Sequence, residues 1–284
     1  MLRDVAQLRR AACAAAALAL AMPGAAARAD SRLDAHYTAS VAGLGVGKTD
    51  IAVVIGSAEY TSAANGRASG LLRTLLSGEG TLATRGAVLD GRLVPASFSA
   101  RTAGDDETSA VTMTLEGGNA KDVTAQTSDP GAERVPLTAE NRKGVVDPLS
   151  ALLVPVGGTG AAAAAEACQR TLPIVDGRRR FDLALSYKRI DQVKAKGYAG
   201  PAVVCAVAFK AIAGHKVGSP LVKYLGGGRE IELTLAPIAG TRLLAPFRLS
   251  IANMLGNIVV EATAFESSST PADLVAQPAV GQAR

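Results

Sequence analysis

The chain has 284 residues, with 30 basic and 25 acidic side chains, no Trp, five Tyr and five Phe. Aromatic platforms for polysaccharides or single-stranded nucleic acids are therefore scarce. Outside the N-terminal segment the one basic cluster is Arg178–Arg180, which is too short for the basic stripe of a nucleic-acid-binding protein, so we expect no nucleic-acid partner.

The N-terminal segment has the pattern of a secretory signal peptide. Arginines precede an apolar run at residues 11–23, which is shorter than the roughly 20 residues that span a bilayer. Ala27-Arg28-Ala29 then supplies the small-x-small cleavage motif, so we predict a signal peptide over residues 1–29 and a periplasmic mature chain from Asp30. Its removal leaves 26 of the 30 basic and 24 of the 25 acidic residues, a charge of about +2.

The first motif of the mature chain is the glycine-rich run at residues 42–49, which satisfies a relaxed phosphate-binding loop. Such a loop requires a helix directly after its Lys-Thr pair. Residues 50–55 are instead a β-branched run typical of a strand. We therefore interpret the glycines as a hairpin turn between residues 34–41 and that strand, and expect no nucleotide.

Alternation with a period of two recurs along the chain and predicts strands that are buried on one face. In residues 180–189, Phe181, Leu183, Leu185 and Tyr187 share a face opposite polar side chains. Similar patterns occupy residues 111–115, 203–209, 229–235 and 242–251. Turn signals separate the strands at Asn65-Gly66, Asp90-Gly91, Gly117-Gly118-Asn119, Asp176-Gly177 and Gly226-Gly227-Gly228.

These features predict a mainly β fold with long antiparallel strands that curl into an open or spiral-like β-barrel. We expect one domain over residues 30–266 and a disordered, Ser- and Pro-rich tail over residues 267–284. Short helices are expected at residues 70–76, 138–142, 147–153 and 161–169. An outer-membrane barrel needs aromatic girdles and an apolar outer band. Because the outward faces here carry charges, we expect a chain that does not span the membrane.

Two cysteines, Cys168 and Cys205, remain once Cys13 leaves with the signal peptide. In an oxidising compartment they are expected to form a disulfide. Closing a loop of this length stabilises a fold by roughly 4 kcal/mol in the chain-entropy model. Neither a C-x-x-C spacing nor a thioredoxin-like pattern indicates a redox function.

Catalytic candidates are few, because His36 and His215 are the two histidines of the chain. No G-x-S-x-G nucleophile motif occurs, and neither histidine has a carboxylate at local spacing. Asp105-Asp106-Glu107 is typical of a solvated turn. No set of residues matches a zinc site. We therefore expect no enzyme activity, no cofactor and no metal.

Several segments resemble the proteobacterial exported family of domain of unknown function 3108. They include residues 33–40, the glycine-rich stretch from 70 to 80, Val146-Asp147-Pro148-Leu149, residues 168–182 and residues 200–205. More distantly, the Cys-to-Asp-Gly-Arg pattern is similar to alphaproteobacterial envelope-integrity proteins. That similarity implies an open, spiral-like barrel with one disulfide and a role in the cell envelope, while fold-level likeness is a weak guide to function.

The favoured hypothesis is a non-enzymatic periplasmic protein that supports the cell envelope by binding a lipid-like ligand or an envelope protein. Its candidate apolar concave wall consists of Leu183, Leu185, Leu233, Leu235, Leu243, Phe247 and Leu249. Two alternatives remain open at this point. One is a structural or interaction protein with a filled barrel, and the other is an unrecognised envelope hydrolase built around His36 or His215.

Overall fold

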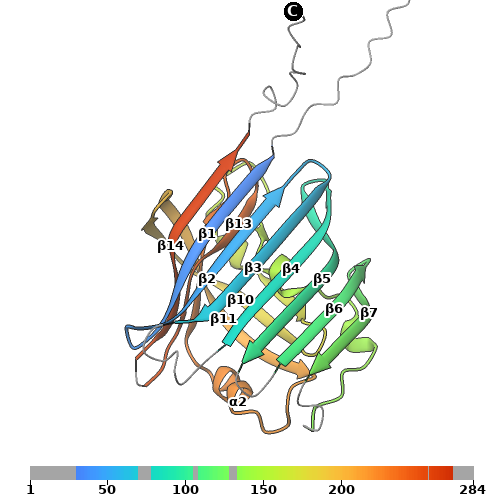
Figure 1. Cartoon of the computed structure of the whole chain (residues 1–284). Coiled ribbons are helices and arrows are strands. Elements are labelled where there is room, and N and C mark those ends of the chain that lie inside the picture. The colour runs from blue at the N-terminus through green and yellow to red at the C-terminus, as the bar shows by residue number, and fades with distance from the viewer. Residues whose placement is uncertain (1–29, 70–77, 105–107, 128–132, 255, 271–284) are drawn as a thin grey trace, which may run out of the picture.

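A single antiparallel sheet curls into a nearly closed β-barrel in the computed structural model (Figure 1). The structure describes residues 30–69, 78–104, 108–127, 133–254 and 256–270. The order of hydrogen-bonded strands is β7-β6-β5-β4-β3-β2-β1-β14-β13-β12-β11-β10-β9, and β8 pairs with β13. The expected mainly β fold with long antiparallel strands is confirmed.

The sheet consists of two meanders that meet where β1 pairs with β14. The N-terminal meander contains β1 (Ser31–Val41), β2 (Leu44–Ile55), β3 (Glu59–Ala68), β4 (Gly78–Leu89), β5 (Arg92–Gly104), β6 (Thr108–Glu116) and β7 (Asn119–Thr127). The C-terminal meander contains β9 (Arg170–Val175), β10 (Arg180–Ala195), β11 (Tyr198–Ala213), β12 (Ile231–Pro237), β13 (Leu243–Ile251) and β14 (Ile258–Ser269), while β8 (Val154–Pro155) lies between the meanders in sequence.

The antiparallel register places the connections at two ends of the barrel. We call one end the packed end, and it carries the connections at residues 56–58, 90–91, 117–118, 196–197 and 238–242. We call the other end the cavity end, and it carries the connections at residues 42–43, 176–179, 214–230 and 252–257. The helix α2 (Pro220–Gly226) lies at the cavity end, at the bottom of Figure 1.

The packed end is filled by side chains from both meanders. The rings of Tyr198, Phe247 and Phe265 pack against one another, with centroids 5.6–6.2 Å apart. Consecutive residues Leu243 and Leu244 are both buried, so the β12–β13 hairpin is covered on its two faces. The tip of the β10–β11 hairpin continues onto β14, because the Lys196 amide donates to the Thr263 carbonyl at 3.2 Å. This end therefore has a filled core.

One seam separates β7 from β9, and the segment that precedes α1 (Pro148–Ala151) bridges it. The Val145 amide donates to the Gly118 carbonyl at 2.7 Å, and the Val175 amide donates to the Val146 carbonyl at 3.0 Å. At the cavity end, Gly177 has a φ of +87°, and a Cβ there would lie 2.3 Å from Cγ1 of Val111. Glycine therefore allows the β9–β10 turn to approach β6 closely.

The hairpin turns agree with the sequence except at Asn65-Gly66 and at Gly226-Gly227-Gly228, where Gly226 ends α2 within the β11–β12 connection. Asp90-Gly91 and Gly117-Gly118 form turns with positive φ, as expected. Asn65 and Gly66 lie inside β3 and pair with β2 and β4 on either side. The hairpin prediction there is wrong because strands on both sides fix the extended backbone.

The first glycine-rich run is only partly a turn. Ala42 and Gly43, with φ of 50° and 81°, connect β1 to β2, while Gly45 and Gly47 belong to β2 itself. Strand pairing therefore begins earlier than we expected. At the other terminus, β14 runs to Ser269, which pairs with Ser31. The ordered strand extends three residues past the expected boundary at 266, and residues 271–284 lie outside the described part.

Helices are short, as expected, and those within the described residues are shorter than predicted. The helix expected at 147–153 is α1 (Pro148–Ala151). The helix expected at 161–169 is limited to the 3-10 turn η3 (Ala165–Cys168), and a second 3-10 turn, η2 (Glu140–Arg142), lies within the segment expected at 138–142. No side chain caps η3, and isolated helices of this length are marginal even in Ala-rich sequences. The helix expected at 70–76 lies outside the described residues.

Candidate functional site: an apolar cavity at one end of the barrel

A cavity of about 690 Å³ lies inside the barrel at the cavity end. Both meanders contribute to its wall. Phe98 and Val111 come from the N-terminal meander, and Phe181 and Phe209, whose ring centroids are 5.7 Å apart, come from the C-terminal one. Its further apolar lining includes Leu82, Ala100, Pro148, Leu152, Val207, Ala211, Ala213, Ile231 and Ile251. The wall is thus predominantly apolar.

The helix α2 contributes Leu221, Val222 and Leu225 to the same lining. The sequence explains this helix, although we did not predict it. Ser219 accepts a hydrogen bond from the Val222 amide at 3.4 Å, and Pro220 occupies the first turn. A Ser-Pro pair before an apolar stretch is a recognised start signal. Tyr224 fastens the helix by donating its hydroxyl to the Ala252 carbonyl at 3.2 Å.

The seven residues proposed for a concave wall lie in three different surroundings. Leu183, Leu233 and Leu249 line the cavity. Leu185 and Leu235 are buried in the neighbouring cluster that contains the disulfide. Leu243 and Phe247 belong to the filled core of the packed end. The structure therefore does not bring them together as one wall.

The expected alternation of β10 stops at Tyr187, which still pairs with the buried Cys205 directly before a bulge. The register between β10 and β11 shifts between Tyr187 and Arg189. Tyr187 is exposed, whereas Leu185 on the same expected face is buried. A bulge inserts an extra residue and reorients the side chains that follow it, so the expected alternation ends there.

Charged residues occur at one part of the cavity wall, around the β9–β10 turn. Asp176, Arg178, Arg179 and Arg180 line it. The Asp176 carboxylate caps the turn by accepting from the amides of Arg178 and Arg179, and it pairs with the Arg179 guanidinium at 3.0 Å. Arg180 pairs with Asp182. Arg178 donates to Ser109 Oγ at 2.9 Å, and this bond joins the two meanders across the seam.

The two histidines lie in different places. His36 on β1 lies 2.5 Å from Asp50 through its Nδ1, and both side chains are exposed. His215 lines the cavity, and its buried Nδ1 has no hydrogen-bond partner in the described part of the chain. The structure thus separates the two residues around which a hydrolase site was considered.

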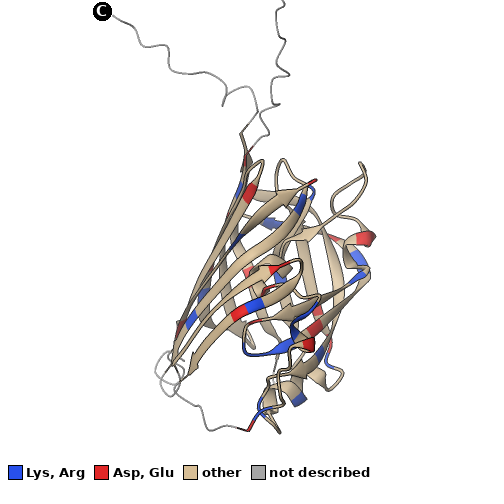
Figure 2. Cartoon of the chain, turned by 90° about the vertical axis from the view of Figure 1, so that its right-hand side faces the viewer, with Lys and Arg blue, Asp and Glu red and all other residues tan. Residues whose placement is uncertain are grey.

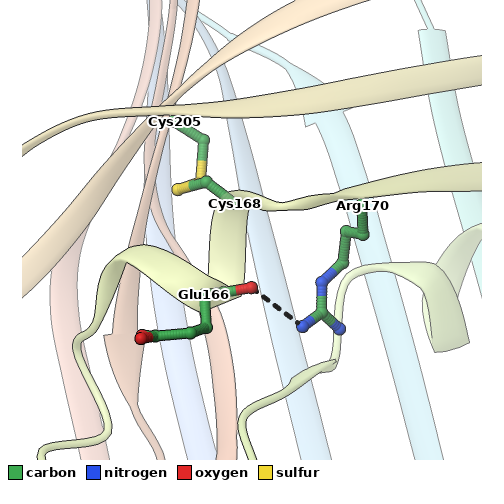
Figure 3. Close-up of a disulfide and its surroundings, with 4 residues drawn as sticks. All are labelled: Glu166, Cys168, Arg170 and Cys205. Atoms are coloured by element: carbon green, nitrogen blue, oxygen red, sulfur yellow. Dashed lines mark hydrogen bonds between the residues drawn. A yellow bond between two sulfur atoms is a disulfide. The ribbon is translucent and has the colours of Figure 1, made fainter.

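The disulfide joins Cys168 at the end of η3 to Cys205 in the middle of β11 (Figure 3). Both residues are fully buried in the cluster that underlies the cavity wall. Beside them, Arg170 donates to the Glu166 carbonyl at 3.3 Å, while burial lowers the pKa of its guanidinium. The expected disulfide is confirmed.

A buried polar cluster lies where the cavity borders the packed end. Asp147 caps α1 by accepting from the amides of Leu149 and Ser150, both at 3.0 Å. Its second oxygen accepts from the hydroxyls of Ser150 and Thr84, and Ser150 also bonds the Tyr60 hydroxyl at 2.6 Å. Burial raises the pKa of Asp147 and raises that of Tyr60 to about 12. The cluster therefore fixes α1, and Pro148 of this helix and Leu152 directly after it line the cavity.

The remaining chemistry of the described residues is limited. They contain no group of three or more His, Cys, Asp or Glu side chains arranged to hold a metal ion. None of the helices among them is long and apolar enough to cross a membrane. In the view of Figure 2, acidic and basic segments are interspersed. The cavity is the feature of the described structure that best fits a ligand site.

Comparisons with known proteins place the chain in a family. No curated protein matches it. A solved structure, described as a β-barrel-like protein of domain of unknown function DUF1849 from Brucella abortus, has 15% identity and a TM-score of 0.49, covering 86% of this chain and 100% of that one. The family model described as "Protein of unknown function (DUF3108)" matches residues 35–263. The chain therefore belongs to the DUF3108 family.

Proposed function

We propose that this chain is a non-enzymatic protein of the bacterial cell envelope that binds a lipid-like apolar ligand in the cavity. The observation that carries the proposal is the cavity itself, enclosed by apolar side chains of both meanders and by α2. Ligand sites commonly have volumes of roughly 300–1,000 Å³ and an apolar wall with a few polar groups that orient the ligand. The cavity of about 690 Å³, with charged groups at the β9–β10 turn, has this composition.

The predicted signal peptide and the disulfide support the envelope location. Residues 1–29 have the pattern of a cleavable signal peptide. The disulfide between Cys168 and Cys205 is of the kind that persists in oxidising compartments such as the periplasm. Both features favour a ligand from the cell envelope.

Native mass spectrometry of protein purified from the periplasm without harsh detergent, combined with organic extraction, tests the proposal. We expect a stoichiometric adduct of lipid size. Ala211→Trp would fill the cavity and abolish the adduct, because Ala211 lines it. Ala208→Trp is the matched control, since Ala208 is exposed on the same strand. A clean apo mass that persists after incubation with envelope lipids would contradict the proposal.

The alternative is a structural or interaction protein without a small ligand. The filled core around Phe247 and Phe265 favours it for the packed end. An apo mass together with unchanged stability of Ala211→Trp would support this alternative, because it would show that the cavity has no occupant to displace.

A further inference from the structure

We propose that the cavity end of the barrel docks onto an anionic lipid bilayer, so that the cavity lies next to the membrane surface. This inference rests on the proposed function for its purpose, which is exchange of a lipid-like ligand. Its physical basis is separate, because it depends on the outer surface of the cavity end and not on an occupant of the cavity.

The first observation is the position of exposed apolar side chains. Single exposed apolar residues are ordinary, whereas several that gather in one patch mark an interaction surface. Leu44, Val217, Leu221 and Met254 are 64%, 56%, 58% and 90% exposed. They come from three connections that are far apart in sequence, and all three connections lie at the cavity end.

Hydrogen bonds hold these three connections side by side. The Ala42 amide of the β1–β2 turn donates to the Asn257 carbonyl at 3.0 Å. The Ala252 carbonyl accepts from Tyr224 of α2 at 3.2 Å, and the Ala252 amide donates to the Glu230 carbonyl at 2.9 Å. The exposed apolar side chains therefore belong to one continuous surface.

The charge of this surface indicates what binds to it. Within the connections at residues 42–43, 214–230 and 252–257 the basic residues are Lys216, Lys223 and Arg229, and the one acidic residue is Glu230, which pairs with Lys188 of β10. Lys48 lies nearby in sequence, on β2. Apolar side chains on turns, flanked by Lys and Arg, are the combination that binds the interface of an anionic bilayer.

The cavity and this surface share α2. Leu221 lines the cavity and is also more than half exposed to the outside. The helix is short, ends at Gly226 and is followed by Gly227 and Gly228. Docking of this end would therefore bring the helix that covers the cavity into contact with the lipid.

The absence of Trp from the chain gives a clean test by fluorescence. We would place a single Trp at position 254 by Met254→Trp, and add vesicles of phosphatidylglycerol and phosphatidylcholine in equal amounts. A blue shift of the Trp emission is expected, because position 254 would enter the interface. Leu89→Trp is the matched control, since Leu89 is 57% exposed but lies beside the turn at 90–91 of the packed end. Its emission should not shift.

Vesicle flotation provides the second test. Leu44→Glu combined with Met254→Glu should lower partitioning onto these vesicles by about tenfold or more, since two apolar contacts are lost and two negative charges are added. Leu89→Glu combined with Ile190→Glu adds the same charge elsewhere and should leave partitioning within about twofold. Neither Leu44 nor Met254 lines the cavity, so the lipid adduct in native mass spectrometry should persist in the first double variant.

The outcomes separate the two proposals. Absence of a blue shift at position 254, or equal partitioning of both double variants, would overturn docking even if the cavity holds a lipid. Binding that is equally strong on vesicles of phosphatidylcholine alone would overturn the anionic specificity. A vesicle-bound protein that carries no lipid adduct would support docking and contradict the proposed ligand.

Discussion

The two ends of this barrel are built from the same alternating strands, yet one is filled and the other is hollow. At the packed end, the β12–β13 hairpin is buried on both faces, and Phe247 and Phe265 occupy the interior. At the cavity end, the comparable rings of Phe181 and Phe209 line about 690 Å³ of space. Alternation along each strand therefore determines which side chains face the barrel interior. Whether those side chains pack against one another depends on how much of the interior other segments fill, as they do around the β12–β13 hairpin.

The largest expected change in the free energy of unfolding comes from truncating a phenylalanine at the packed end, compared with one at the cavity end. Phe247→Ala should lower the free energy of unfolding by about 3–5 kcal/mol, because it leaves a void in a filled core. Phe209→Ala should cost much less, about 1–2 kcal/mol, because its ring borders space that already exists. Urea denaturation of both variants measures this difference, and equal losses would show that the cavity end is packed in solution.

The next effect concerns the disulfide beneath the cavity wall. Replacing both Cys168 and Cys205 with Ala should lower the free energy of unfolding by about 2–4 kcal/mol. Since the bond fastens β11, which lines the cavity, amide exchange should increase more around Val207 than around Phe265. Uniform exchange across both ends would contradict this local role.

The next largest loss of stability is expected at Asp147, which lies in the buried polar cluster between the two ends. Asp147→Ala should cost about 1–3 kcal/mol, because α1 loses its cap and the hydroxyls of Thr84 and Ser150 lose an acceptor. Chemical denaturation measures the loss, and Thr138→Ala serves as a control, because its side-chain bond to Asn141 is exposed. A loss below about 0.5 kcal/mol would contradict the importance of this cluster.

The pKa of Asp147 predicts a pH effect of definite sign. Burial raises the pKa in the folded state above its unfolded value. Protonation therefore favours the fold, and this contribution is present below the unfolded pKa and is lost as the pH rises through the folded pKa. Wild type should lose stability relative to Asp147→Asn over that rise, and a difference that is constant with pH would contradict the raised pKa.

The smallest effect involves an ion-pair network on the outer surface, away from the interior of either end. Arg189 and Lys188 on β10 lower the pKa of Glu232 on β12 to about 2. The stabilisation is present above the ordinary Glu pKa and is lost as the pH falls from about 4.5 to about 2. Because the partners are partly exposed, we expect about 1 kcal/mol, measured by comparing wild type with Glu232→Gln across this range.

Much of this architecture could be predicted from the sequence, because period-two alternation, Asp90-Gly91 and the two cysteines are local signals. Asn65-Gly66 misled the prediction because neighbouring strands outweigh a turn preference. The alternation of β10 could not be extended past Tyr187, because a bulge follows that residue.

The site was harder to predict than the fold. Leu183, Leu233 and Leu249 line the cavity, whereas Leu243 and Phe247 have the same pattern and lie in the filled core. Sequence does not distinguish them, because their surroundings depend on the path of the β12–β13 hairpin through the barrel. The helix α2 could have been found from Ser219-Pro220, but its position over the cavity results from tertiary contacts.

The pairing of β1 with β14 has a consequence for folding kinetics. Ser31 pairs with Ser269, so the first and last strands of the described chain are neighbours in the centre of the sheet. Each meander can form from contacts between successive strands, but their union requires closing a loop of more than 200 residues. Long-range strand pairing of this kind slows folding. Pairing of β1 with β14 is therefore expected to be a late, rate-limiting step of folding. It can occur only when the whole polypeptide, including its last strand, is available.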